Sequence, residues 1–366
     1  VPLQSVISFN FLGFVKREVT FTGQSTINIV LEAENKSLGE VVVTALGIKR
    51  EKKSLGYAVQ EVKGENLVET RENNVANALS GKVAGLQVVR SSNGPAGSSK
   101  IVLRGNNSLT GDNQPLIVVD GVPVDNFTGA TNNDFWNPTL DKGNGMSDIN
   151  PEDIESLTVL KGPTSAALYG SRAGNGVILI TTKSGKKQNG LGITVSSAVG
   201  LENVFTNPKM QSSFAQGENN LYDKETSLSW GPKIDGQSVE TWDGKNAPLA
   251  SYDNVGNYLD QGVSYNQNVT FQQVYNQTSI YSSLNYLNDK SMLPGVKLDK
   301  LNLMAKAVSH FGPDNRWTVD TKIQYTNSNA QNRPQGGPRG DNAFYSSYLL
   351  PRSLDITQFK KSLDAN

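Results

Sequence analysis

Two carboxylates near the middle of the first half of the chain have a spacing that could support catalysis. Asp120 and Asp125, in the segment DGVPVDN, could form the acid and the nucleophile of a glycoside hydrolase. Asp120 is followed directly by Gly121, however, and an Asp-Gly pair is a common sequence for a tight turn. We therefore interpret the segment as a turn, and we expect the protein to have no catalytic residues.

A glycine-rich segment offers a second candidate chemistry. The sequence KGPTSAALYGSRAGNG, residues 161–176, follows an apolar run and resembles a phosphate-binding loop. It lacks the Gly-Lys-Ser/Thr ending of that loop, and it has neither the glycine spacing nor the later acidic residue of a dinucleotide site. Nucleotide binding is therefore not expected.

The sequence contains few residues that could ligate a metal ion or a cofactor. The chain has no cysteine, and its one histidine, His310, lies in a segment typical of a strand that runs into a turn. The Gly-Asp-Asn triplets at 111–113 and 340–342 lack the ligand spacing of a calcium loop. We expect neither a bound metal ion nor a cofactor.

The composition favours a β-rich protein that does not bind nucleic acid. The 366 residues include 34 Lys plus Arg and 34 Asp plus Glu, so no basic excess attracts nucleic acid. The 35 glycines, with many Asn, Ser and Thr, indicate turns. No apolar run approaches the roughly 20 residues of a membrane helix, so any crossing of a bilayer must use barrel strands.

The chain divides into four segments by sequence texture. Residues 1–35 alternate apolar and polar side chains around a TGQS break at 22–25, which predicts the last strands of a small β-sandwich or, alternatively, a free-standing hairpin. Residues 36–56 form a charged linker that contains the apolar strand sequence EVVVT. No turn follows that would fold a partner strand back, so we expect this strand to be unpaired within the chain.

Residues 57–185 predict a compact α+β domain. We expect short helices within 72–85 and 165–169, and an Asn150 cap on a turn that begins at Pro151. The expected strands share apolar, β-branched sequences and lie at 57–62, 85–92, 98–105, 115–119, 154–160 and 176–183.

Residues 186–366 contain five long segments with strict two-residue alternation. In the last, Trp317, Val319 and Ile323 share one face, and polar residues take the other. Aromatic residues near segment ends, Tyr281 and Tyr286 among them, fit an outer-membrane barrel, although a soluble antiparallel sandwich alternates in the same way. The aromatic-rich loop region 206–262 could hold sugar rings or peptide side chains, or simply pack as a loop.

Four stretches of the sequence resemble successive signatures of one family. These are LGEVVVTALGIKREKKSLGYAVQ, NVANALSGKVAGLQV, SSKIVLRGNNSLTGDNQPLIVVDGVPVDN and INPEDIESLTVLKGPTSAALYGSRAGNGVILITTKSGK. Their order and spacing are similar to those of the SusC/RagA-type TonB-dependent outer-membrane transporters of Bacteroidetes. The similarity is strong over residues 15–190 and rests on strand pattern alone beyond them.

The resemblance implies a mainly β fold, in which an α+β plug lies inside an antiparallel transmembrane barrel. Residues 1–35 would end a carboxypeptidase-regulatory-like β-sandwich, 36–56 would carry the Ton box, 57–185 would be the plug, and 186–366 would begin the barrel. The barrel of this family has twenty-two strands. Residues 186–366 supply about five or six, so we expect an incomplete barrel and an N-terminal portion of a transporter.

The resemblance also implies partners and sites. TonB, energised by inner-membrane proteins, would pair with the Ton box residues Glu40, Val41, Val42, Val43 and Thr44. The protein would lie in outer-membrane lipid with its plug and N-terminal domain on the periplasmic side, would work with a SusD-like lipoprotein, and would import an oligosaccharide or a peptide. The plug residues expected to face the substrate are polar or aromatic: Asn106, Asn107, Asp112, Asn113, Asp125, Asn126, Phe127 and Trp136.

Two other classes of function stay open at this point. A surface adhesin or glycan-binding structural protein without energy coupling would share the β-rich, Asn- and Gly-rich sequence. It has no use, however, for an exposed EVVVT segment or a plug-like domain. An envelope enzyme such as a glycosidase is the third possibility, because carboxylate chemistry does not require histidine.

Overall fold

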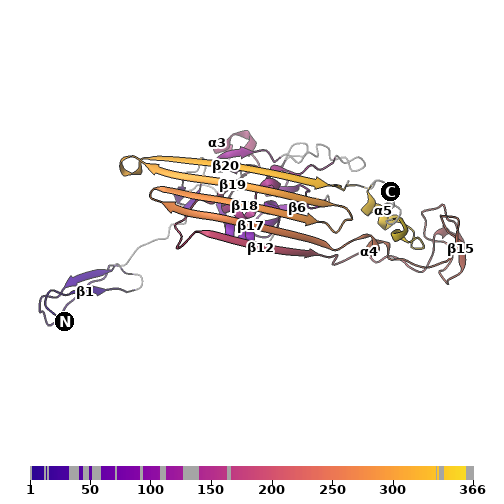
Figure 1. Cartoon of the computed structure of the whole chain (residues 1–366), viewed down its shortest axis with the longest axis horizontal. Helices are drawn as coiled ribbons and strands as arrows, with labels where there is room; N and C mark the ends of the chain where they lie inside the picture. The colour runs from indigo at the N-terminus through magenta and orange to yellow at the C-terminus, as the bar shows by residue number, and fades with distance from the viewer. Residues whose placement is uncertain are drawn as a thin grey trace.

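The computed structural model describes residues 2–11, 14, 16–32, 41–43, 49–51, 59–70, 72–90, 94–107, 113–126, 140–162, 166–334, 336–337 and 342–359. Within these ranges the chain forms small N-terminal sheets, a mixed α+β domain and a wall of five long antiparallel strands. The α+β domain lies against one face of the wall (Figure 1). The mainly β fold class expected from the sequence is confirmed.

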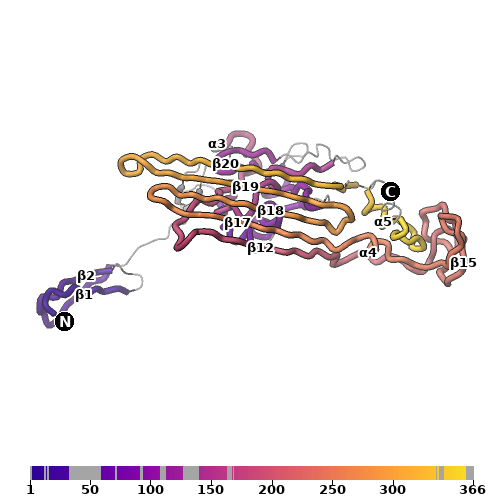
Figure 2. Tube along the Cα trace, viewed as in Figure 1, coloured from indigo at the N-terminus to yellow at the C-terminus, as the bar shows by residue number. Residues whose placement is uncertain are grey.

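The N-terminal strands differ from the prediction. β1 (Val6–Phe9) pairs with β2 (Arg17–Thr20) in an antiparallel two-stranded sheet, which lies apart from the rest of the chain (Figure 2). Residues 27–31 are not a strand, so the TGQS break does not join two strands. The alternation was real, but the partner of Val19 is Ile7. Membership in a larger β-sandwich stays a prediction.

The valine strand has a partner within the chain, so the expectation of an unpaired strand was wrong. β3 (Val41–Val43) pairs antiparallel with β4 (Lys49–Glu51), and the two form a sheet of their own. The partner was missed because β4 consists of charged residues, whereas strand pairing is made by main-chain groups and does not require apolar side chains. Glu40 and Thr44 lie outside the described residues.

The α+β domain is built on a five-stranded mixed sheet. Its strands, in spatial order, are β5 (Val59–Lys63), β10 (Ile154–Leu160), β11 (Val177–Thr182), β8 (Leu116–Val119) and β9 (Val122–Val124). All neighbours are antiparallel except β11 and β8. The predicted turn joins β8 to β9, where Asp120 and Gly121 have φ of 47° and 88°, as a tight hairpin turn requires.

Short helices and a hairpin cover this sheet. They are α1 (Gly64–Val68), α2 (Val75–Ala78), β6 (Leu86–Arg90), β7 (Ser99–Leu103), η3 (Gly145–Asp148), η4 (Pro151–Asp153), α3 (Ala166–Tyr169) and η6 (Ser171–Ala173). Asn150 caps η4 as predicted, whereas α1 was not predicted. The core joins sheet and helices through buried aliphatic side chains: Leu67, Leu79, Ile101, Ile117, Ile154, Leu157 and Ile178.

The wall is a continuous antiparallel sheet of five strands, one for each alternating segment in the sequence. They are β12 (Ile193–Glu202), β17 (Gly262–Tyr275), β18 (Thr278–Lys290), β19 (Lys297–Phe311) and β20 (Trp317–Gln331). Residues 276–277 and 312–316 close one end, which we call the short-turn end. The opposite, long-loop end carries residues 203–261, 291–296 and the segment after β20.

The connections at the long-loop end have structure of their own. They contain β13 (Gly217–Glu218), β14 (Leu221–Tyr222), β15 (Ser238–Glu240), β16 (Asn246–Pro248), α4 (Asn254–Tyr258) and α5 (Ala343–Leu349). η7 (Pro313–Asn315) forms the turn before β20. The loop strands β15 and β16 and helix α5 lie beyond the wall, at the end opposite to the short turns (Figure 2). No helix among the described residues is long and apolar enough to cross a membrane.

The two faces of the wall follow the predicted alternation. In β19 the outward Leu303 is 39% exposed, whereas the inward residues Asn302, Met304 and Lys306 are buried. Tyr281 departs from the expectation of an aromatic residue facing the membrane, because it is only 1% exposed and points toward the α+β domain. Its odd offset from the exposed Tyr286 puts the two rings on opposite faces of β18.

Candidate functional site

The first contact between the α+β domain and the wall surrounds the carboxylate of Asp120. It accepts hydrogen bonds from Thr182 N at 2.9 Å and Thr182 Oγ1 at 2.7 Å, which fix it at the β8–β9 turn. From the wall, Lys322 Nζ lies 2.6 Å and Lys306 Nζ 3.5 Å from its oxygens. Burial alone would raise the pKa of Asp120, but the hydrogen bonds from Lys322 and Thr182 and the Lys306 charge hold this pKa below its usual value of 3.8.

A second contact involves the capping turn before β10. The Tyr281 hydroxyl donates to Asp153 Oδ1 at 3.0 Å, and Asn150 Nδ2 donates to Asp153 Oδ2 at 3.1 Å. Asn150 Nδ2 also lies 3.4 Å from Oδ1 of Asn268 on β17. Burial raises the pKa of Asp153, and the hydrogen bonds from Tyr281 and Asn150 and the charge of Lys183 offset this rise only in part. The pKa values of the two aspartates are therefore shifted in opposite directions, although both residues join the domain to the wall.

The chain leaves the domain through a very close contact with the wall. A β-carbon at Gly185 would lie 2.3 Å from the carbonyl oxygen of Ile280 and 2.6 Å from that of Gln273. Those distances are too short for any side chain, so glycine lets the backbone run directly against β17 and β18. This packing, together with Asp120 and Asp153, fixes the domain on the wall.

At the long-loop end the contacts between the domain and the wall enclose space. Asn73 Nδ2 donates to Asp289 Oδ2 at 2.7 Å, and Lys300 Nζ donates to the carbonyl oxygen of Ser147. Arg333, which follows β20, donates through Nη1 to the carbonyl oxygens of Ala96 at 2.9 Å and Asp141 at 3.0 Å. These bonds bridge the gap between the domain and the wall without filling it.

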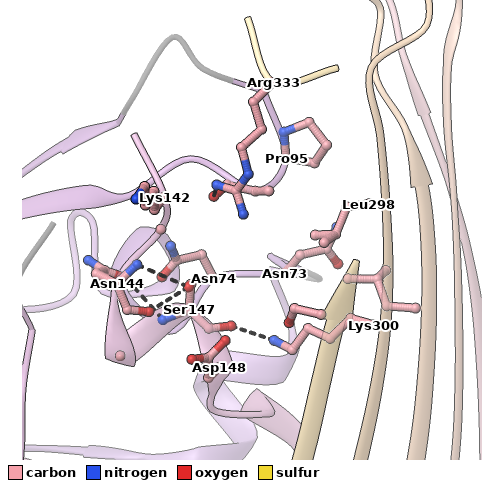
Figure 3. A pocket seen from close by; sticks show the side chains of 15 residues that line it. Asn73, Asn74, Pro95, Lys142, Asn144, Ser147, Asp148, Leu298, Lys300 and Arg333 are labelled. Atoms are coloured by element: carbon pink, nitrogen blue, oxygen red, sulfur yellow. Dashed lines mark hydrogen bonds between the residues drawn. The ribbon is translucent and has the colours of Figure 1, made fainter. Parts of the chain in front are cut away.

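Two cavities occupy that gap. The larger has a volume of about 870 Å³ and is lined by the loop that follows β12, by α5 and by the domain. The smaller, about 260 Å³, lies between Lys142 and Ser147 of the domain and Lys300 of the wall, with Arg333 above it (Figure 3). Both are lined by Asn73, Asn74 and Pro95, so they adjoin one another.

The structure places most of the predicted substrate-facing residues elsewhere. Asp125 and Asn126 line a separate cavity of about 300 Å³ with Gln114 and Arg172, all from the α+β domain. Asn126 Nδ2 donates to Gln114 Oε1 at 3.0 Å.

The asparagines of the preceding loop hold that loop together. Asn113 is buried and accepts a hydrogen bond from the backbone N–H of Asn107 at 2.7 Å, while Asn106 is exposed. Asp112, Phe127 and Trp136 lie outside the described residues.

The sequence contained a signal for one of the site residues that the prediction missed. Lys300 shares the even-numbered register of Asn302, Met304 and Lys306, and period-two alternation puts all four side chains on one face of β19. Asn73 and Arg333 lie in loops and gave no such signal. Among the described residues, no group of three or more His, Asp or Glu side chains could hold a metal ion.

Comparisons with known proteins agree with this architecture. Residues 51–177 match the family model of the TonB-dependent receptor plug domain. TonB-dependent receptor P26 of Formosa agariphila is 32% identical over 81% of this chain, and TonB-dependent receptor SusC of Bacteroides thetaiotaomicron is 34% identical over 63%. The chain spans 27% and 21% of the lengths of these two relatives.

Solved structures show the same fold. The RagAB peptide importer in its open-open state superimposes with a TM-score of 0.58 at 22% sequence identity, covering 80% of this chain and 32% of that one. A second structure of the RagAB peptide transporter gives 0.57. The α+β domain is thus a plug, the wall is part of a receptor barrel, and the chain belongs to the SusC/RagA-type family of TonB-dependent transporters.

Proposed function

We propose that the protein imports a nutrient across the outer membrane, driven by TonB and gated by the plug. The observation that carries the proposal is the attachment of the plug to the inward face of the wall through buried polar contacts. Such contacts can break and re-form without loss of an apolar core, which suits a domain that must move aside during transport. Import requires no bond in the cargo to be broken, so we assign no enzymatic activity.

The valine strand β3 is the segment that TonB would bind and pull in this proposal. β3 lies in a sheet of only two strands, so one of its edges has no strand beside it among the described residues. Isolated two-stranded sheets are marginally stable in water. A strand of TonB would pair with β3 at its open edge or in place of β4, and main-chain hydrogen bonds would supply the affinity. Glu40 and Thr44 would flank this contact as the rest of the Ton box.

The orientation of the wall in the outer membrane would follow from the lengths of its loops. In outer-membrane barrels the short turns face the periplasm and the longer loops face outward. The short-turn end, the plug entry and the N-terminal sheets would then lie on the periplasmic side, and the two cavities would face the cell exterior. A SusD-like lipoprotein would cover the long-loop end and deliver an oligosaccharide or a peptide.

The test is uptake by cells that express the whole receptor with Val42→Pro. Proline removes the N–H of Val42 and disrupts strand pairing, so accumulation of the cargo should fall to the level of a receptor deletion. The measurement is accumulation of a panel of labelled oligosaccharides and peptides, with receptor abundance in the outer membrane checked in parallel. Val42→Thr is the matched control, since it keeps the N–H and the strand propensity. Equal uptake by the proline variant and the wild type would refute TonB coupling through this strand.

A further inference from the structure

Lys300 is a buried cation of the wall that lines the smaller cavity. Its side chain is 4% exposed, and its ammonium donates to the carbonyl oxygen of Ser147. Within the described part of the chain, no carboxylate lies within ion-pair distance of Lys300 Nζ, and the nearby Asp148 is exposed to solvent. A buried ammonium is costly unless an opposite charge compensates it. Its neighbourhood therefore favours an anion.

The surrounding cavity has the same electrostatic preference. Among the described residues that line the cavity of about 260 Å³, Lys142, Lys300 and Arg333 are basic and Asp148 alone is acidic. These described residues therefore give the lining a formal charge of +2. Figure 3 shows Lys300 on the wall side of the cavity, Lys142 on the plug side and Arg333 above them. Arg333 uses Nη1 for two carbonyl oxygens, and a guanidinium has further N–H donors.

The ligand of this cavity is defined by its charge, and we propose that the cavity binds a carboxylate group of the imported cargo. Lys300 supplies the buried charge, and Arg333 and Lys142 add to the positive potential at the mouth. Charge-assisted hydrogen bonds to a carboxylate are stronger than neutral ones, so such a group would orient the cargo as well as hold it. Two sources share this chemistry, namely the uronic acid of an oligosaccharide and the carboxylate of a peptide.

The adjoining cavity can hold the rest of such a molecule. Its volume of about 870 Å³ and its lining by Phe205, Phe344 and Tyr348 suit the apolar faces of sugar rings or of peptide side chains. Glu202 and Asp289 also line it, so a positive group at the other end of the ligand would find acidic partners. A short peptide carries both charges, whereas a uronic acid carries only the negative one. The proposal rests on the proposed import function for its cargo.

The experiment measures binding to the purified whole receptor in detergent, without TonB. One arm compares a trigalacturonate with its methyl ester. The other arm compares a pentapeptide that has a free C-terminal carboxylate with the same pentapeptide as its C-terminal amide. The wild type should bind the acid of at least one pair more tightly than its neutral partner. Lys300→Met should weaken the binding of that acid by about tenfold or more and leave the binding of its neutral partner unchanged.

The matched control is Lys297→Met on the same strand. Lys297 lies three positions earlier, on the outward face, and is paired with Asp299 at 2.8 Å, so its loss removes the same charge outside the cavity. This variant should bind every ligand as the wild type does. Equal binding of acid and neutral partners in both arms, or equal losses in the two variants, would overturn the proposal. Because the assay needs no energised partner, failure of TonB coupling would leave its result unaffected.

Discussion

Lys306 and Lys300 lie on the same strand, six residues apart, with their side chains on the same face of the wall, and they have opposite surroundings. Both are buried, at 6% and 4% exposure. Lys306 contacts Asp120, Thr182 and Asp320, all within 3.5 Å. Lys300 contacts one carbonyl oxygen and a cavity. The plug therefore neutralises the wall near the short-turn end and leaves it positively charged near the long-loop end.

This difference separates attachment from recognition. Toward the short-turn end, a carboxylate held by Thr182 is presented to two lysines, so the charges are satisfied inside the protein. Toward the long-loop end, the only acceptor that Lys300 finds in the described part of the plug is the backbone carbonyl oxygen of Ser147. A buried charge that the protein does not neutralise is available to a ligand. The three predictions that follow would break or sharpen this comparison.

The largest effect is expected at the attachment site. Asp120→Asn leaves Lys306 and Lys322 without their shared carboxylate and should lower the free energy of plug opening by about 3 kcal/mol. Hydrogen exchange of the β8 and β11 amides in the whole receptor measures this quantity. Asp320→Asn removes the half-exposed partner of the same Lys306 and should cost less than about 1 kcal/mol. Equal effects of the two variants would show that Asp120 is not the anchor.

Acid should reproduce part of that loss. The pKa of Asp120 lies below 3.8 in the folded protein, so its stabilising contribution is complete above about pH 4 and disappears as pH falls through the lowered pKa. Asp153 acts in the opposite sense, because its raised pKa makes protonation favour the folded state. The difference in plug-opening free energy between wild type and Asp120→Asn should shrink from pH 6 to pH 3. A constant difference would contradict the ionic nature of the contact.

The smallest effect on stability is expected when each of the two buried lysines is replaced by methionine. Lys306→Met leaves Asp120 with one ammonium instead of two and should destabilise the plug by about 1–2 kcal/mol. Lys300→Met removes a buried charge without a carboxylate partner and should be neutral or slightly stabilising. Thermal unfolding of the ligand-free receptor would rank the two variants. A larger loss at Lys300 would mean that its role is structural and that the contrast is wrong.

The sequence by itself determined the local structure of the plug and the wall. The β8–β9 turn at Asp120 and Gly121, the Asn150 cap and the five wall strands were all predictable, because turns, caps and alternation depend on residues close together in the chain. Alternation also separated the face of β20 that carries Trp317, Val319 and Ile323 from its polar face. The resemblance to the SusC/RagA family depended on the same local segments.

Only the tertiary structure decided which residues meet. Asp120 and Lys322 are separated by 202 positions, and neither carries a local mark of its partner. The same holds for the cavity that Lys300 and Arg333 line together with residues of the plug. Period-two alternation predicts that a side chain points inward, but it does not predict which residues that side chain contacts. That is set by how the plug docks, through contacts between residues far apart in the chain.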